Sequence, residues 1–161
     1  MNNSNKIIIG IDCDVDKSGI AFVRGGSITR LFNLNLWKTF DLIAEAFSLY
    51  KNESKEILVV IEAGWIDKSG KEAKNKSYHG GGKGSSYDVG RNSEIGRQIA
   101  KFCHENKIPY VLRQPRGYSS LNAAQFKSIT KYEGKTNSET RVAALFALDE
   151  WNLLNLQSKT K

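Results

Sequence analysis

Two short apolar runs, each ending in a carboxylate, constrain the fold of this chain most strongly. The first run covers residues 7–11, four isoleucines and one glycine, and is followed by Asp12. The second covers residues 57–61, all aliphatic, and is followed by Glu62. Runs this short, β-branched and uniformly apolar predict strands buried on both faces, as in a sheet with helices on either side.

The rest of the chain completes an α/β pattern. Turn-forming residues at 14–19 and the pair Gly25–Gly26 separate three extended segments, which predicts that three antiparallel strands open the chain. The strands expected from this pattern cover residues 6–12, 20–24, 28–32, 57–61 and 108–112. Helices are expected over 39–50, from about 92 onward, and over 137–156. The order β-β-β-α-β-α-β-α predicts one α/β domain over residues 1–161, with a five-stranded mixed sheet flanked by helices.

Charge predicts the kind of partner. The chain has 24 lysine and arginine residues against 17 aspartate and glutamate residues, a formal net charge of +7, which favours a polyanion and nucleic acid first. Residues 66–87 are rich in glycine and lysine and predict a flexible basic loop. The residues expected to contact phosphates lie in and after this loop: Lys68, Lys71, Lys74, Lys76, Lys83, Arg91, Arg116, Lys127, Lys131 and Lys135.

Cysteine usage and hydropathy predict the compartment. Cys13 and Cys103 are too few for a disulfide framework or a four-thiolate zinc site, so a reducing environment is expected. The sequence contains no apolar stretch long enough for a membrane span and no secretory signal. We therefore expect a cytoplasmic protein with no membrane partner.

The two strand-end acids are the strongest candidates for a functional site. If their strands are neighbours, Asp12 and Glu62 meet at one edge of the sheet. A lone acid at a strand end is more often simply solvated. Two acids at corresponding positions, each ending a wholly apolar strand, favour a site that a cation or a hydrogen-bond donor compensates. Asp14 and Asp16 lie nearby, but acids in a turn more often cap backbone amides than bind metal.

Four segments resemble motifs of the RuvC-like Holliday junction resolvases of the RNase H-like superfamily. They are residues 8–12 with 18–21, 59–62, 89–97 and 136–145, and the long basic insertion looks most like phage-borne members. The resemblance implies an RNase H-like fold and a homodimer that cleaves branched DNA, in the host cytoplasm if a phage encodes it. It also implies that Asp12, Glu62 and an acid of the last helix are catalytic and hold Mg²⁺, with Mn²⁺ as a substitute, for phosphodiester hydrolysis.

The last helix departs from the family pattern. Members of this family commonly carry two acids three residues apart there, whereas here Glu139 is followed at that spacing by Val142. Glu139 is the expected third ligand, and Asp149, two turns beyond Val142, is a weaker substitute. A competing interpretation is a capping box over residues 136–139, in which Glu139 only bonds the backbone of Thr136.

Three other functions stay open at this point. The chain could be an RNase H-like nuclease acting on RNA–DNA hybrids, or one acting on linear DNA. It could also be a non-catalytic DNA-binding module that lost a metal ligand at Val142.

Trp65 could stack on unpaired bases of a junction, although an aromatic residue beside a strand more often serves packing.

Overall fold

The computed structural model describes residues 5–66, 69–71 and 83–159. A five-stranded sheet with the strand order β3-β2-β1-β4-β5 forms its centre. Its strands are β1 (Lys6–Asp12), β2 (Ser18–Arg24), β3 (Ser27–Leu34), β4 (Glu56–Glu62) and β5 (Tyr110–Arg113). β1, β2 and β3 are antiparallel, whereas β4 and β5 run parallel to β1. The predicted mixed sheet, with three antiparallel strands first, is confirmed.

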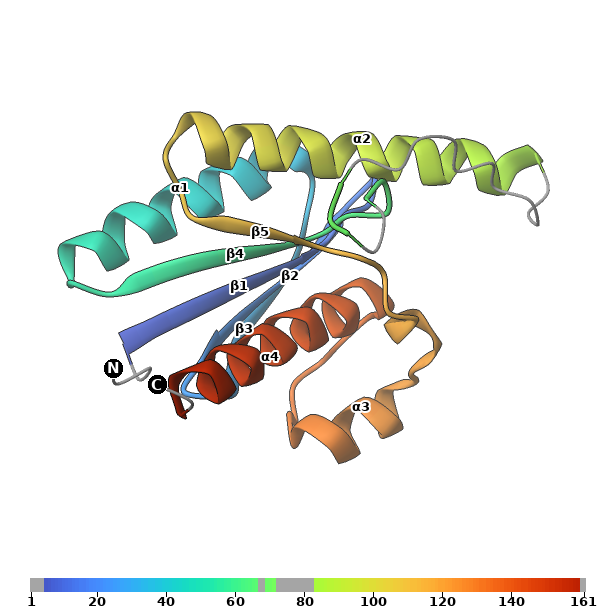
Figure 1. The fold of residues 1–161 in the computed structure, drawn as a ribbon. Coiled ribbons are helices and arrows are strands. Elements are labelled where there is room, and N and C mark those ends of the chain that lie inside the picture. The colour runs from blue at the N-terminus through green and yellow to red at the C-terminus, as the bar shows by residue number, and fades with distance from the viewer. Residues whose placement is uncertain (1–4, 67–68, 72–82, 160–161) are drawn as a thin grey trace.

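Helices cover both faces of this sheet. They are α1 (Leu36–Asn52), α2 (Lys83–Glu105), α3 (Ala123–Thr130) and α4 (Ser138–Lys159), with a short 3₁₀ turn, η2 (Tyr118–Ser120). α1 and α2 lie on one face, and α4 lies on the other with α3 beyond it (Figure 1). In the described ranges, no helix is long and apolar enough to cross a membrane. Cys13 and Cys103 are both buried and free.

The side chains of β1 alternate between the two layers. Ile7, Ile9 and Ile11 pack in the core under α1 and α2, whereas Ile8 packs with residues of α4. Because successive side chains of a strand point to opposite faces, Asp12 lies on the α4 face. This alternation determines which helix can reach the end of β1.

Two glycines let α4 approach the sheet closely. A Cβ atom at Gly10 would lie 2.0 Å from the carbonyl oxygen of Ala143, and one at Gly19 would lie 2.2 Å from that of Glu139. No real Cβ atom tolerates such distances, so both positions require glycine. The first turn of α4 is thereby seated directly on β2.

Two helices differ from the sequence-based expectation. α2 begins at Lys83 rather than near residue 92, so residues 83–87 of the predicted loop are helical. The rest of that loop falls mostly on residues 67–68 and 72–82, which lie outside the described residues. α3 is an additional helix that the sequence pattern does not predict. Its eight residues are fixed by a capping box between Asn122 and Gln125, a local hydrogen-bond pattern that periodicity over so short a segment does not reveal.

Candidate active site

The ends of four strands form one row on the α4 face of the sheet. Asp12 pairs with Gly19 of β2, and Glu62 pairs with Arg113 of β5. Ile11 pairs with Ile61, so Asp12 and Glu62 are the next residues along two parallel neighbouring strands. Residues paired in this way point to the same face, so the register alone brings the two acids together.

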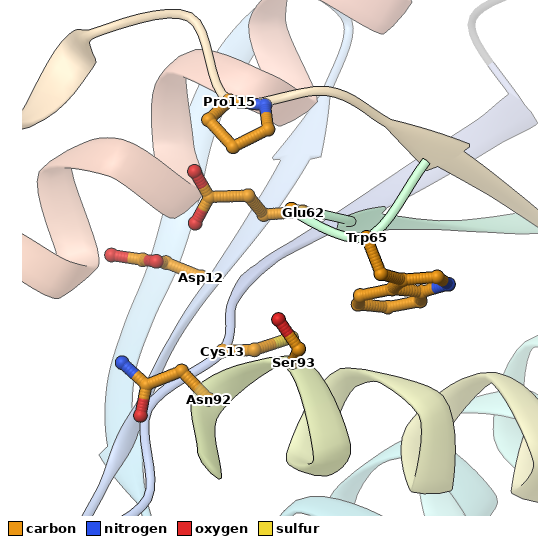
Figure 2. Close-up of a pocket in the computed structure, with 8 residues that line it drawn as sticks. Asp12, Cys13, Glu62, Trp65, Asn92, Ser93 and Pro115 are labelled. Carbon is orange, nitrogen blue, oxygen red and sulfur yellow. The ribbon is translucent and has the colours of Figure 1, made fainter. Parts of the chain in front are cut away.

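Asp12 and Glu62 form a carboxylate pair. Their side chains share a hydrogen bond, and Figure 2 shows the two carboxyl groups lying close together. Burial, that hydrogen bond and the negative charge of Glu62 raise the pKa of Asp12 from 3.8 to about 9, with smaller contributions from Glu139 and Asp14. Every charged group that shifts this pKa is an acid. The pair therefore has to hold a proton or a cation between its oxygens.

Glu139 lies close enough to Asp12 for its charge to raise the pKa of that carboxyl group. The backbone of Glu139 packs on Gly19, which is the register partner of Asp12. The cap of α4 is formed by other residues: Thr140 N donates to Asn137 Oδ1 at 2.9 Å, and Asn137 N donates to Thr140 Oγ1 at 3.0 Å. The competing interpretation, a capping box between Thr136 and Glu139, is therefore wrong. Glu139 instead accepts a hydrogen bond from the adjacent Ser138 hydroxyl.

The two other α4 positions considered from sequence do not join the pair. Val142 is 4% exposed and packs in the apolar layer with Ile8, Val60 and neighbouring residues. Asp149 accepts hydrogen bonds from Arg116, at 2.8 Å, and from the hydroxyl of Tyr118. It is also absent from the acids that shift the pKa of Asp12. Asp149 is thus engaged elsewhere and does not substitute for a ligand at Val142.

Asn92 of α2 ties down the turn after β1. Its side chain donates to Asp14 Oδ2 at 3.3 Å and accepts from Val15 N at 3.0 Å. Asp14 Oδ1 accepts from the backbone N–H groups of Asp16 and Lys17 at 2.9 and 3.4 Å. The expectation that Asp14 caps backbone amides is confirmed. Sequence reasoning did not identify Asn92, because the link depends on a contact between segments 77 residues apart.

A cavity of about 270 Å³ opens beside the carboxylate pair. Its lining, shown in Figure 2, consists of Asp12, Cys13, Glu62, Gly64, Trp65, Asn92, Ser93 and Pro115. The Trp65 ring lies under the guanidinium of Arg97, 5.3 Å from it, and against Gly96, where a Cβ would be 2.5 Å from the ring. Trp65 is therefore a packing residue that also forms a wall of this cavity.

The residues predicted to contact phosphates differ in exposure and in partners, as far as the structure describes them. Lys71, Arg91, Lys131 and Lys135 are exposed. Two others are paired with acids: Arg116 with Asp149 at 2.8 Å and Lys127 with Glu133 at 2.5 Å. Lys68, Lys74 and Lys76 lie outside the described residues, and Lys83 is the first residue of α2. We refer to Lys127, Lys131 and Lys135, which lie in and just after α3, as the lysine group.

The donor chemistry of the pair fits a hard divalent cation. Carboxylate oxygens are the ligands that Mg²⁺ and Mn²⁺ prefer, and two half-buried acids side by side form an electrostatic site for such a cation. Within residues 5–66, 69–71 and 83–159, no three acidic, histidine or cysteine side chains surround one point. The structure thus brings together two candidate ligands, Asp12 and Glu62, with Glu139 nearby as a third acid.

Comparison with known proteins shows the fold. No protein-family model and no curated protein sequence matches the chain. Among solved structures, it is similar to T. thermophilus RuvC in complex with a Holliday junction substrate. The TM-score is 0.56 at 11% sequence identity, and the match covers 94% of this chain and 96% of that chain. The chain therefore has an RNase H-like fold, with the strand order β3-β2-β1-β4-β5, that resembles RuvC.

Proposed function

We propose that this protein is a metal-dependent endonuclease that cleaves four-way or otherwise branched DNA. The observation that carries the proposal is the pair of half-buried carboxyl groups, Asp12 and Glu62, which two parallel strands bring together beside a cavity. Placing two partly buried acids side by side is unfavourable unless a proton or a cation binds between them. A metal-dependent phosphodiester nuclease needs such a cation site.

The residues of the chain have distinct roles in this reaction. Asp12 and Glu62 would hold the cation directly, and Asp12 would release its proton as the cation binds. Glu139 would complete the ligand set from the first turn of α4, where Gly19 lets the helix approach. Bound Mg²⁺, or Mn²⁺ in its place, would make a hydroxide available and stabilise the leaving oxygen. Asn92 keeps the turn after β1 in place, so that Asp12 faces the cavity in one orientation.

Several features support branched DNA as the substrate. The similar structure, RuvC, was solved with a Holliday junction substrate, and the net charge of +7 suits a polyanionic ligand. The lysine group lies in α3 and in the segment that leads from α3 to Glu139, so its positive charges belong to the segment that enters the site. A four-way junction has two-fold symmetry, so two copies of the chain would place one site on each of two strands. We therefore include a homodimer in the proposal.

The experiment is a cleavage comparison on three labelled substrates. A four-way junction, a linear duplex of the same sequence and an RNA–DNA hybrid are incubated with the full chain in Mg²⁺, Mn²⁺ or EDTA. We expect cleavage of the junction in either metal, little cleavage of the other two substrates, and none in EDTA. Faster cleavage of the hybrid or of the linear duplex would instead support a different nuclease of this fold.

Binding measurements separate an enzyme from a non-catalytic module. Salt-sensitive junction binding without cleavage in any metal would favour the non-catalytic DNA-binding alternative. Sedimentation with and without the junction tests the dimer. One chain per junction would contradict the two-site arrangement.

A further inference from the structure

Arg113 stands directly beside Glu62. The two residues are register partners on the parallel strands β4 and β5, and both point to the α4 face. Neighbouring strands are about 4.8 Å apart, so an arginine side chain at this position has the reach to bind the Glu62 carboxylate. An ion pair there would occupy the oxygens that the proposed cation needs.

The backbone of Arg113 is fixed in this position. Ala63 N donates to the carbonyl oxygen of Arg113 at 2.7 Å, and the side chain of Gln114 donates to the carbonyl oxygen of Ile66 at 2.8 Å. Both bonds join the end of β5 to the residues that follow Glu62. Arg113 can therefore change its partner only by rotating its side chain.

The guanidinium of Arg113 is bound by Glu150 of α4 instead. Arg113 Nε lies 2.7 Å from Glu150 Oε2, and Nη2 lies 2.8 Å from Oε1, a bidentate pair. Glu150 is 4% exposed, so both of its oxygens are committed to this contact. Arg113 is not among the groups that act on Asp12, although it stands next to Glu62.

We infer that Glu150 is a positioning residue that holds Arg113 away from Glu62 and so keeps the carboxylate pair available to a divalent cation. The inference rests on the proposed metal-dependent function and assigns to that site a residue that the cation does not touch. Stability alone is a weak explanation of the pair, because an ion pair with a buried acid often adds little net stability over apolar residues. Because Arg113 lies beside Glu62, its pairing with Glu150 leaves the Glu62 carboxylate available to a cation.

The test is Mn²⁺ binding measured by calorimetry on folded protein at pH 8. Glu150→Gln keeps the shape of the side chain but removes its charge, so Glu62 becomes the strongest partner within reach of Arg113. A charge-assisted hydrogen bond of that kind is worth about 1.5 kcal/mol, so we expect Mn²⁺ affinity to fall about tenfold. Adding Arg113→Gln to this variant removes the competing charge and should restore wild-type affinity.

Arg113→Gln alone separates positioning from stability. It leaves Glu150 buried without its partner and lowers the melting temperature, yet Mn²⁺ affinity should equal or exceed that of the wild type. Weaker Mn²⁺ binding by folded Arg113→Gln overturns the inference. Unchanged Mn²⁺ affinity in Glu150→Gln also overturns it, and so does a double variant that does not recover wild-type Mn²⁺ affinity. Failure of the proposed function looks different: the wild type itself would bind Mn²⁺ no better than Asp12→Asn.

Discussion

Asp12→Asn is expected to stabilise the metal-free protein. In the folded chain the pKa of Asp12 is raised to about 9, mainly by burial and by Glu62, against an ordinary value of 3.8. Folding therefore takes up a proton at any pH between these values. Proton uptake by Asp12 contributes to the free energy of unfolding. This contribution is fully present below about pH 4 and falls by about 1.4 kcal/mol per pH unit as pH rises, until about pH 9.

The magnitude at neutral pH follows from these values. Relative to its value below pH 4, the free energy of unfolding of the wild type falls by at most about 4 kcal/mol at pH 7 and by at most about 2 kcal/mol at pH 5. Asparagine keeps the shape of the side chain, and its amide can donate to Glu62 without any proton uptake. The free energy of unfolding of Asp12→Asn should therefore exceed that of the wild type by an amount that grows over this range.

Urea unfolding followed by circular dichroism, in EDTA at pH 5, 7 and 9, measures this difference. Asp41→Asn, which changes an exposed aspartate of α1, is the matched control and should leave the pH dependence of the wild type unaltered. Added Mg²⁺ should stabilise the wild type at pH 7 but not Asp12→Asn, because only the wild type keeps both carboxylates of the proposed site. If the difference in unfolding free energy between Asp12→Asn and the wild type is constant from pH 5 to pH 9, proton uptake by Asp12 is not its cause.

Three further predictions concern α4 and the lysine group. Glu139→Gln should abolish Mg²⁺-dependent junction cleavage without lowering the melting temperature, whereas Asn137→Ala, which removes the real cap, should cost about 1 kcal/mol in urea unfolding. Gly19→Ala should displace α4, destabilise the protein by about 1–3 kcal/mol and abolish cleavage, while Gly90→Ala, where a Cβ meets nothing within 4 Å, should do neither. In the last variant, the lysine group is changed to glutamine. The slope of log K for junction binding against log salt should then fall by up to about 0.9 for each phosphate that is no longer neutralised. An unchanged slope would show that these lysines do not contact DNA.

The sheet and its two strand-end acids could be predicted because their signals are local. The runs at residues 7–11 and 57–61 are too apolar and too short for anything but central strands. Once such strands are parallel neighbours, their register places Asp12 beside Glu62 without further information. Gly10 and Gly19 carry a local signal as well, since a glycine inside a strand often marks close approach by another backbone.

The remaining features depend on interactions between distant segments or on a choice between equivalent patterns. The cap of α4 is ambiguous in the sequence because two overlapping patterns, at 136–139 and 137–140, both have the spacing of a helix cap, and only the second forms. The ion pair between Arg113 and Glu150 joins residues 37 positions apart, and Asn92 reaches the turn after β1 from 77 positions away. No periodicity in one sequence indicates such pairs.

The proposed role of Asp12 is tested by single-turnover cleavage and binding of one four-way junction, measured for the wild type and for Asp12→Asn. The amide removes one charge from the proposed metal site but leaves the lysines of the proposed DNA interface unchanged. We therefore expect cleavage in Mg²⁺ to be lost, while junction affinity measured in EDTA stays within a few-fold of wild type. Asp41→Asn, as the control, should cleave and bind like the wild type. Cleavage by pure Asp12→Asn at a rate near that of the wild type would show that Asp12 does not belong to the active site.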